Sequence, residues 1–309
     1  MRKLLKIIVS LFSALILTAL MVPVLLSILL SSHTVQNRVA DRLARLATDR
    51  LGTPVSVDRV RMRLFNRAVV EGFYVQDYAG DTLLYVRSLD AGVKGYNPLT
   101  GVVRLGDVRL DGAKFYLSQD STGTMNLKYV TEKLKSDKPK RNRKPLRLRA
   151  GSLRVTDTRF KLRKYVVPDK PYGVNFADLD VRGIDMDVQA VRMHGDSIGA
   201  SLQSLAFAEK SGFVCRRLSA SRVTVAGSGM TPDDLAVVDP YSDIRMERLR
   251  FDYPAWKAYK DFARQVEMHA TLKPSLVSFR TIACFAPSLR EWKSVLDVKG
   301  TVDGTVSDL

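Results

Sequence analysis

Histidine and cysteine chemistry, including zinc binding and thiol catalysis, would have to be built here from three histidines and two cysteines. His33, His194 and His269 are isolated, with no partner at the spacing that zinc ligands use. The sequence contains neither a Gly-x-Ser-x-Gly elbow nor a His-Glu-x-x-His pair, and both common glycine-rich phosphate-binding patterns are absent. We therefore predict that the chain is not an enzyme and has no catalytic, cofactor-binding or metal-binding residues.

The two cysteines, Cys215 and Cys284, both lie in β-like runs. An exported compartment would allow a disulfide between them, but the sequence does not place them within bonding distance. Two buried free thiols are the simpler alternative, and we favour that alternative.

An apolar run, Ile7–Leu30, opens the chain and contains 24 residues without a charge. As a helix it would be about 36 Å long, enough to cross a hydrocarbon core of about 30 Å with some tilt. The alternative is a cleaved signal peptide, whose apolar region is shorter and ends at a small-x-small site that residues 27–32 do not offer. We predict an uncleaved membrane anchor bounded by Ile7 and Leu30.

Basic residues on the two sides of this run are nearly balanced, so the positive-inside rule gives only a mild preference. Arg2, Lys3 and Lys6 abut the run, whereas the following basic residues begin eight positions beyond it, at Arg38. This arrangement favours a cytoplasmic N-terminus and an exported body.

The formal net charge of +17 is concentrated in one tract. Lys133–Arg149 holds nine lysines and arginines against one acid, Asp137. Such a run is typical of a solvated, mobile loop, and contact with anionic lipid headgroups is the functional alternative. Nucleic acid is not an expected partner, because the chain is anchored and the tract lacks interleaved aromatic residues.

Residues 34–51 are predicted to form an amphipathic helix that ends at Gly52 and Pro54. Its apolar side consists of Val35, Val39, Leu43, Leu46 and Leu51. We expect this helix to plug the end of the following sheet, in preference to lying on a membrane surface.

From Pro54 onward the hydrophobic period changes to two, which predicts short strands in an antiparallel meander. One face is expected to carry Leu83, Tyr85, Leu89, Ala91 and Val93. Helical spacing interrupts the pattern at 125–134, a short helix is expected to start at 231–234, and an aromatic core stripe occupies 254–266. The alternation at 298–306 predicts an exposed sheet edge, and hence either a fragment or an edge that meets a partner.

An ordered series of local patterns runs through the chain. After the anchor come residues 49–57 (Asp-Arg-Leu-Gly-Thr-Pro-Val-Ser-Val), 69–77 and 80–85, and later Phe251-Asp252-Tyr253 with Trp256, 284–289, and 300–306 (Gly-Thr-Val-Asp-Gly-Thr-Val). This series resembles the AsmA-like superfamily, and more closely the N-terminal part of translocation and assembly module proteins of the TamB type.

The resemblance implies a single-pass inner-membrane protein whose body projects into the periplasm of a Gram-negative cell. It implies a mainly β fold, in which the two helices precede a curled, elongated antiparallel sheet with an apolar groove. The divisions would be residues 1–31 (cytoplasmic N-terminus and anchor), 32–132 (helix and meander), 133–149 (basic linker) and 150–309 (continuing groove with short helices). About 15–20 strands would span roughly 70–95 Å, which is short for bridging two membranes.

Proteins of this superfamily are associated with phospholipid movement toward the outer membrane, and TamB-type members with outer-membrane protein assembly and secretion. The expected partners are therefore membrane lipids, the inner membrane, and an outer-membrane insertase or further β-groove segments. The groove candidates are Val55, Val57, Phe73, Val75, Tyr85, Leu89 and Val155. Two alternatives stay open beside a lipid conduit: the ordinary core of a β-sandwich, and a scaffold that pairs with clients through its open edge.

Overall fold

The computed structural model of the chain describes residues 33–63, 66–97, 100–133, 147–168 and 170–308. The expected anchor, Ile7–Leu30, and most of the basic tract lie outside these ranges. Within them, no helix combines the length and the apolar character that a bilayer crossing requires.

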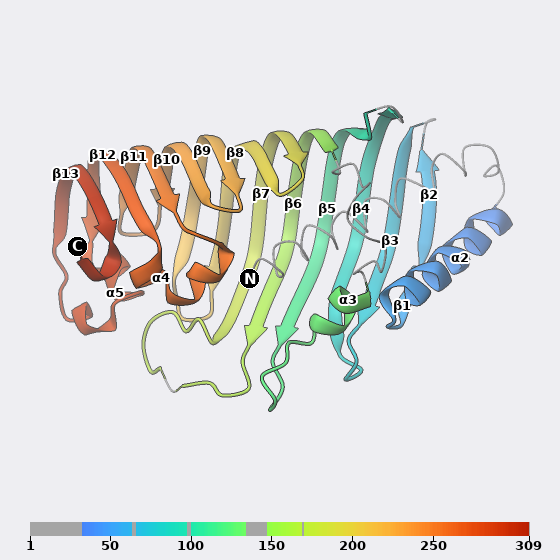
Figure 1. The fold of residues 1–309 in the computed structure, drawn as a ribbon, viewed down its shortest axis with the longest axis horizontal. Helices are drawn as coiled ribbons and strands as arrows, with labels where there is room; N and C mark the ends of the chain where they lie inside the picture. Colours follow the sequence, from blue (N-terminus) through green and yellow to red (C-terminus); the bar gives the residue numbers. More distant parts are fainter. Residues whose placement is uncertain (1–32, 64–65, 98–99, 134–146, 169, 309) are drawn as a thin grey trace.

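The described residues form one open, mainly β sheet of 13 strands (Figure 1), which confirms the β class. In sheet order the path is β1, then β3 to β13 in sequence, with β2 paired to β3. The strands are β1 (Val55–Ser56), β2 (Arg59–Arg63), β3 (Arg67–Gln76), β4 (Thr82–Asn97), β5 (Val102–Ser118), β6 (Arg147–Arg163), β7 (Asp178–His194), β8 (Ser197–Glu209), β9 (Val214–Ala226), β10 (Gly229–Val238), β11 (Asp243–Asp252), β12 (Glu267–Ser278) and β13 (Val295–Thr305).

The sheet is mixed, which corrects the expectation of a purely antiparallel one. β5 and β6 are parallel, and their paired residues are 45 apart in the sequence, from Val102 and Arg147 to Ser118 and Arg163. The reason is the long connection between them, which begins with a turn and α3 (Lys128–Lys133) and returns the chain to the end at which β5 started. Parallel neighbours require such a crossover, whereas hairpins suffice elsewhere in this sheet.

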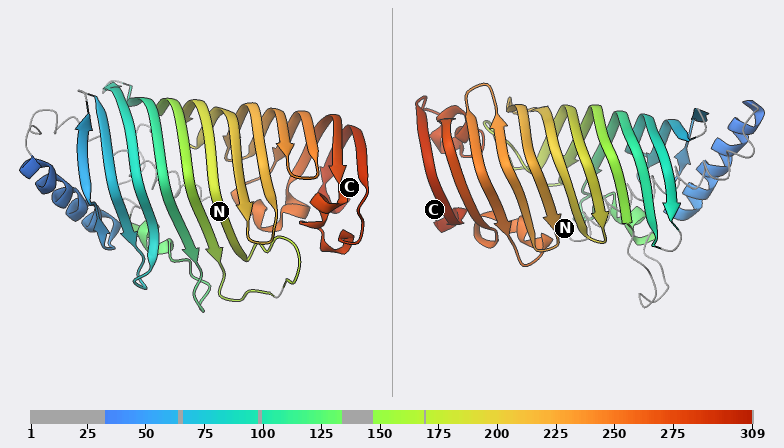
Figure 2. Two further views of the ribbon diagram at one scale, coloured as in Figure 1. Left: turned by 180° about the vertical axis from the view of Figure 1, so that it is seen from behind. Right: turned by 90° about the horizontal axis from the view of Figure 1, so that it is seen from above.

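The first described helix, α2 (His33–Leu51), lies against the β1–β2 edge of the sheet (Figure 2). It ends where predicted: Gly52 has a φ of 69°, and its N–H donates to the Thr48 carbonyl at 2.8 Å. Ala40 and Leu51 belong to the same buried cluster as the first strands and α3. The helix therefore closes this end of the sheet, as the plug interpretation expected, but Leu46 does not belong to the buried side and is 55% exposed.

Several strands carry places where two successive residues both face outward. One line of such places, here named the first crease, crosses four strands at 71–72, 87–88, 111–112 and 156–157. Three residues on it have positive φ: Gly72, Gly112 and Asp157, at 64°, 62° and 49°. Because each outward pair shifts the alternation by one residue, a strict period of two does not predict which side chains share a face.

One other expectation needs correction. Residues 231–234 do not start a helix but lie inside β10, where Pro232 pairs with Val223 of β9 and Asp234 has a φ of 48°. Proline is tolerated in strands next to such irregularities, and sheet pairing overrides a local capping pattern. The aromatic stripe at 254–266 forms η2 (Trp256–Asp261) followed by one turn, α4 (Phe262–Gln265).

The remaining described helices lie near β12 and β13: α5 (Phe279–Ala283), η3 (Pro287–Leu289) and η4 (Val306–Asp308). The expected linker, residues 133–149, begins with Lys133 in α3 and ends with Arg147–Arg149 in β6. The sheet thus runs through this point of the chain without interruption.

Candidate functional site: the inner face of the curved sheet

A continuous row of apolar side chains crosses the inner face of the sheet perpendicular to the strands. Each member pairs with the next through the strand register, and paired residues point to the same face. The row, here named the inner row, is Val70, Leu89, Leu110, Val155, Met186, Leu205, Leu218, Val237 and Ile244. It passes through nine strands, from β3 to β11, without a polar residue.

The inner face is closed at its β1–β5 end. Ala40 and Leu51 of α2, with Leu127 and Val130 next to and within α3, form one buried cluster with the inner side chains of these strands. Predicted groove residues in this cluster are Val55, Phe73, Val75 and Leu89, which are buried, and Val57, which is partly buried. These residues therefore belong to a packed core.

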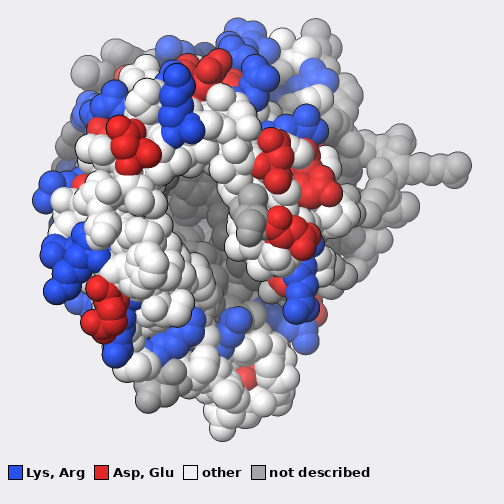
Figure 3. All heavy atoms as spheres, turned by 90° about the vertical axis from the view of Figure 1, so that its left-hand side faces the viewer, with Lys and Arg blue, Asp and Glu red and all other residues white. Residues whose placement is uncertain are grey.

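Inner side chains from β8 to β13 are more open. Four small or medium residues are buried there, namely Ala220, Leu235, Leu249 and Ala270. Around them lie apolar residues that keep part of their surface accessible: Leu202, Leu218, Val223, Val237, Met246, Phe251, Met268, Leu272 and Val302. Seen from the β13 end, the molecule has a central hollow with mostly uncharged walls, and the charged side chains lie on its outer side and rim (Figure 3).

Tyr85 is a groove candidate that the structure places on the outer face of the sheet, not on the inner face. Its Cα partners are Tyr74 and Lys114, and the Lys114 ammonium lies 5.6 Å from its ring centre. Its neighbour Val86 points inward and is buried. The outward pair at 87–88 explains the error, because it moves Leu89 to the inner face although Leu89 and Tyr85 are four residues apart. Val155 lies on the inner row, between Leu110 and Met186.

The outer face is polar and held together by ion pairs. Arg87 bonds Asp111 at 3.0 Å and also pairs with Asp157, so it ties three strands together at the first crease. Asp180 accepts hydrogen bonds from Arg159 and Arg182, at 2.6 Å each. The hydrogen bond from Arg159, followed by that from Arg182, holds the pKa of Asp180 far below its ordinary value despite burial.

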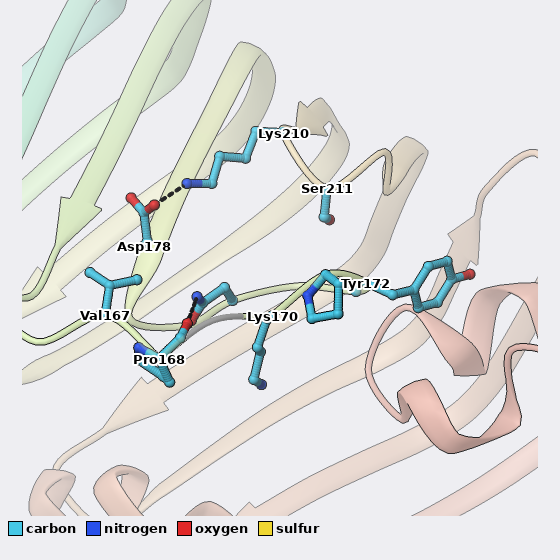
Figure 4. A pocket seen from close by; sticks show the side chains of 10 residues that line it. Val167, Pro168, Lys170, Tyr172, Asp178, Lys210 and Ser211 are labelled. Carbon is cyan, nitrogen blue, oxygen red and sulfur yellow. Dashed lines mark hydrogen bonds and ion pairs between the residues drawn. The ribbon is translucent and has the colours of Figure 1, made fainter.

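Two cavities of the described residues lie at strand ends, and a smaller one lies over the middle of β5–β7, next to Asp107, Arg154 and Asp187. One of about 570 Å³ lies beneath the β6–β7 connection, between Pro168, Tyr172, Lys210 and Ser211 (Figure 4). Lys210 reaches across it to pair with Asp178. Because the lysine charge is already balanced, this cavity lacks a free cation aimed into it and is not a better candidate than the inner face.

The residues considered for chemistry are scattered. Cys215 is a buried free thiol at 2% exposure, and Cys284 is a free thiol that is only half-buried. Burial raises the pKa of both thiols, which lowers the fraction of reactive thiolate. Among the described residues, no three His, Cys, Asp or Glu side chains gather so that they could hold a metal ion.

Sequence reasoning missed most of the open inner face. It named no groove residue beyond Val155. Where an outward pair interrupts the alternation, the pairing of the strands must be known before a side chain can be assigned to the inner or outer face. The recurrence of two polar residues inside otherwise alternating runs, as at Arg216–Arg217, Ser221–Arg222 and Glu247–Arg248, was the available signal. These positions are all exposed.

Comparison with known proteins found no matching family model, curated protein or solved structure. The likeness to the AsmA-like superfamily therefore stays a hypothesis based on residue patterns.

Proposed function

We propose that this chain is an inner-membrane-anchored periplasmic protein of the AsmA/TamB-like type, which supports phospholipid transport toward the outer membrane. Acyl chains would move along the inner face of the sheet while headgroups stay at its open side. The observation that carries this proposal is the part of the inner row from Met186 to Ile244, an apolar path through the five strands β7–β11 whose side chains all keep some accessible surface.

The energetics favour such a path for lipid. Each CH₂ group of an acyl chain that leaves a bilayer for water costs about 0.8 kcal/mol. A moving lipid therefore needs apolar cover along its whole route, and a single deep pocket would hold it in place. A uniform row of aliphatic side chains offers cover without a specific binding position.

Partial accessibility supports the same proposal for β8–β13. A sheet whose inner face was filled by its own side chains would bury them as fully as the β1–β5 end does. Leu202, Met246 and Leu272 instead keep accessible surface next to the buried Ala220 and Leu235. Methionine adapts its shape easily, which suits a surface that contacts chains of varied conformation.

The test places a photo-crosslinking amino acid at Leu202 in the full-length chain within cell membranes. Gln203, the adjacent and exposed residue of the same strand, is the matched control. Mass spectrometry of the adducts should find phospholipid at position 202 and not at 203. Adducts to protein alone at 202, or no adducts in a correctly folded chain, would contradict the conduit.

The second candidate is a scaffold for outer-membrane protein assembly, which pairs with clients or an insertase through β13. It is favoured by the exposed Val295 and Leu296 in that strand, which pairs with β12 on one side. A crosslinker at Val295 should then capture polypeptide, and proline at Val302 should abolish the capture. Capture that survives the proline substitution would contradict edge pairing.

A further inference from the structure

The exposed aromatic side chains of the described residues are concentrated at one end of the strands. This end, here named the aromatic rim, consists of the connections 77–81, 119–133, 164–177, 210–213, 239–242 and 279–294. α3, the β6–β7 connection and α5 lie along the lower edge of Figure 1. Its exposed aromatic residues are Tyr78, Tyr129, Tyr165, Tyr172, Phe176, Tyr241, Phe285 and Trp292.

The opposite strand ends differ. Among the described residues there, Tyr96 is the exposed aromatic side chain. The connections on that side include 195–196 and 227–228, which are short turns without aromatic residues, and 253–266, in which Tyr253 is buried and Tyr259 and Phe262 are partly buried. The asymmetry is therefore a property of the sheet as a whole and not of one loop.

Basic residues accompany these rings. Lys128 precedes Tyr129, Lys164 precedes Tyr165, Lys170 lies two residues before Tyr172, and Lys293 follows Trp292; all four lysines are exposed. The Arg280 guanidinium lies 5.1 Å from the ring centre of Tyr241. In the close view of the cavity, Lys170 and Tyr172 both point away from the Asp178–Lys210 pair (Figure 4).

Most carboxylates of the rim are engaged in its turns. Asp77 accepts from the backbone N–H of Ala79 and Asp81 at 3.0 and 2.8 Å. Asp120, Glu209 and Asp239 cap the following turns in the same way. Of the carboxylates in the described part of the rim, Asp81, Glu132 and Glu291 are exposed and lack such a bond, and Glu291 pairs with Arg290. Because exposed lysines and arginines outnumber these three, the exposed charge is predominantly positive.

Side-chain and backbone contacts link neighbouring connections of the aromatic rim to one another. The β6–β7 connection reaches the segment after β12, where the Val174 N–H donates to the Cys284 carbonyl at 2.7 Å. Phe213 of the β8–β9 turn packs edge-on against Phe285, with ring centres 5.1 Å apart. Tyr78 and Tyr129 pack at 5.6 Å near the other end of the rim. These contacts hold the aromatic residues in fixed relation to one another.

We propose that the aromatic rim rests on the surface of a lipid bilayer. Tyrosine and tryptophan rings prefer the headgroup level, and neighbouring lysines and arginines reach lipid phosphates. The residues lie along a line of separate connections, which matches a flat fluid surface better than a protein partner, since protein interfaces need a compact buried patch. Because the rim follows the sheet from β3 to β13, this contact would lay the inner row parallel to the bilayer. The inference is therefore independent of passage toward the outer membrane and does not require lipid inside the sheet.

The test uses the full chain in vesicles of phosphatidylcholine and phosphatidylglycerol whose acyl chains carry bromine near the headgroup. Trp256→Phe leaves Trp292 as the sole tryptophan, because the chain has two. Bromine quenches tryptophan only on contact, so we expect the emission of Trp292 to fall about twofold relative to unbrominated vesicles. The matched reporter on the opposite strand ends is Trp256→Phe with Trp292→Phe and Tyr96→Trp, whose emission should not change.

A variant with Tyr165, Tyr172 and Phe176 changed to serine tests the aromatic contribution, and should lose most of the quenching at Trp292 while keeping the circular dichroism of the parent. Equal emission of Trp292 in both kinds of vesicle would overturn the proposal and leave the rim to a protein partner. Equal quenching at positions 292 and 96 would overturn it as well. The outcome is separable from the conduit, which is judged by adducts at Leu202.

Discussion

Gly112 shows how single residues set the curvature of the sheet. Its φ of 62° is a conformation that costs other L-residues roughly 1–2 kcal/mol, and a Cβ there would overlap the Arg87 guanidinium. Arg87 in turn bridges Asp111 and Asp157 across the first crease. Backbone conformation and the ion pairs therefore support the same bend.

Gly112→Ala should consequently lower the free energy of unfolding by about 2 kcal/mol, because the cost of the positive φ adds to the loss of the Arg87 ion pairs when that side chain moves aside. Gly183→Ala is the matched control, since it has a φ of 56° but no atom within 4 Å of the added methyl group. Its loss should be about half as large. Urea denaturation measures both, and equal losses would contradict a role for the Arg87 contact.

Asp180 makes a pH-dependent contribution to stability. Its folded pKa lies below the ordinary value of 3.8, so the contribution is present above about pH 4 and disappears as the pH falls through the folded pKa. Asp180→Asn should cost about 1–3 kcal/mol at pH 7, because Arg159 and Arg182 lose a charged acceptor. The difference between the two proteins should shrink below pH 4 in urea titrations. A difference that is constant from pH 7 to pH 2 would contradict this account.

At the scale of elements, α2 has apolar side chains that the sequence pattern places on one side, but only some of them pack against the sheet. Leu51→Ala should lower the free energy of unfolding by about 2–4 kcal/mol, because Leu51 is buried against the first strands. Leu46→Ala should change it by less than about 0.5 kcal/mol, because Leu46 is largely exposed. Thermal and urea denaturation distinguish the two. Equal effects would mean that α2 packs on another side.

The helix and most strands could be predicted because their signals are local. Gly52 and Pro54 terminate α2, and a period of two identifies half-buried strands. The faces of Tyr85 and Leu89 could not be assigned in this way, since an outward pair lies between them. Pro232 was misassigned for a related reason: pairing with β9 outweighs a capping pattern that is only four residues long.

The parallel pairing of β5 and β6 is also indicated in the sequence, by an internal repeat that the search for alternating residues did not detect. Residues 45 apart are identical at Arg104 and Arg149, Gly106 and Gly151, Arg109 and Arg154, Phe115 and Phe160, and Leu117 and Leu162. The structure pairs these strands at the same offset of 45. Two similar strands with bends at equivalent positions stack in register most easily when they are parallel. A search for internal repeats would have suggested this arrangement.

At the scale of the whole molecule, the sheet is shorter than the pattern of runs suggested. The sheet path of the described residues contains 12 strands, or about 50 Å at the usual spacing, instead of roughly 70–95 Å. The proposed function therefore concerns passage along this sheet. The β1–β5 end is filled by α2 and α3, so the accessible part of the path begins near β6.

This division predicts different outcomes for charged substitutions. Val75→Glu should unfold the β1–β5 end, because Val75 is fully buried. Leu202→Glu should leave the fold intact and reduce lipid capture, because Leu202 retains accessible surface. Circular dichroism and lipid content of the purified proteins check the two expectations. Unfolding of both would contradict an open inner face at β8.

The most direct measurement of the central claim is a crosslinking scan along the inner row. A photo-crosslinking amino acid would be placed in turn at Val155, Leu205, Leu218, Val237 and Ile244 of the full chain in membranes. If the row is a continuous lipid path, phospholipid adducts will form at Leu205, Leu218, Val237 and Ile244, which keep accessible surface, and Val155, which is buried, marks where the path closes. Adducts at one position only would indicate a single binding site, and their absence throughout the row would contradict the account.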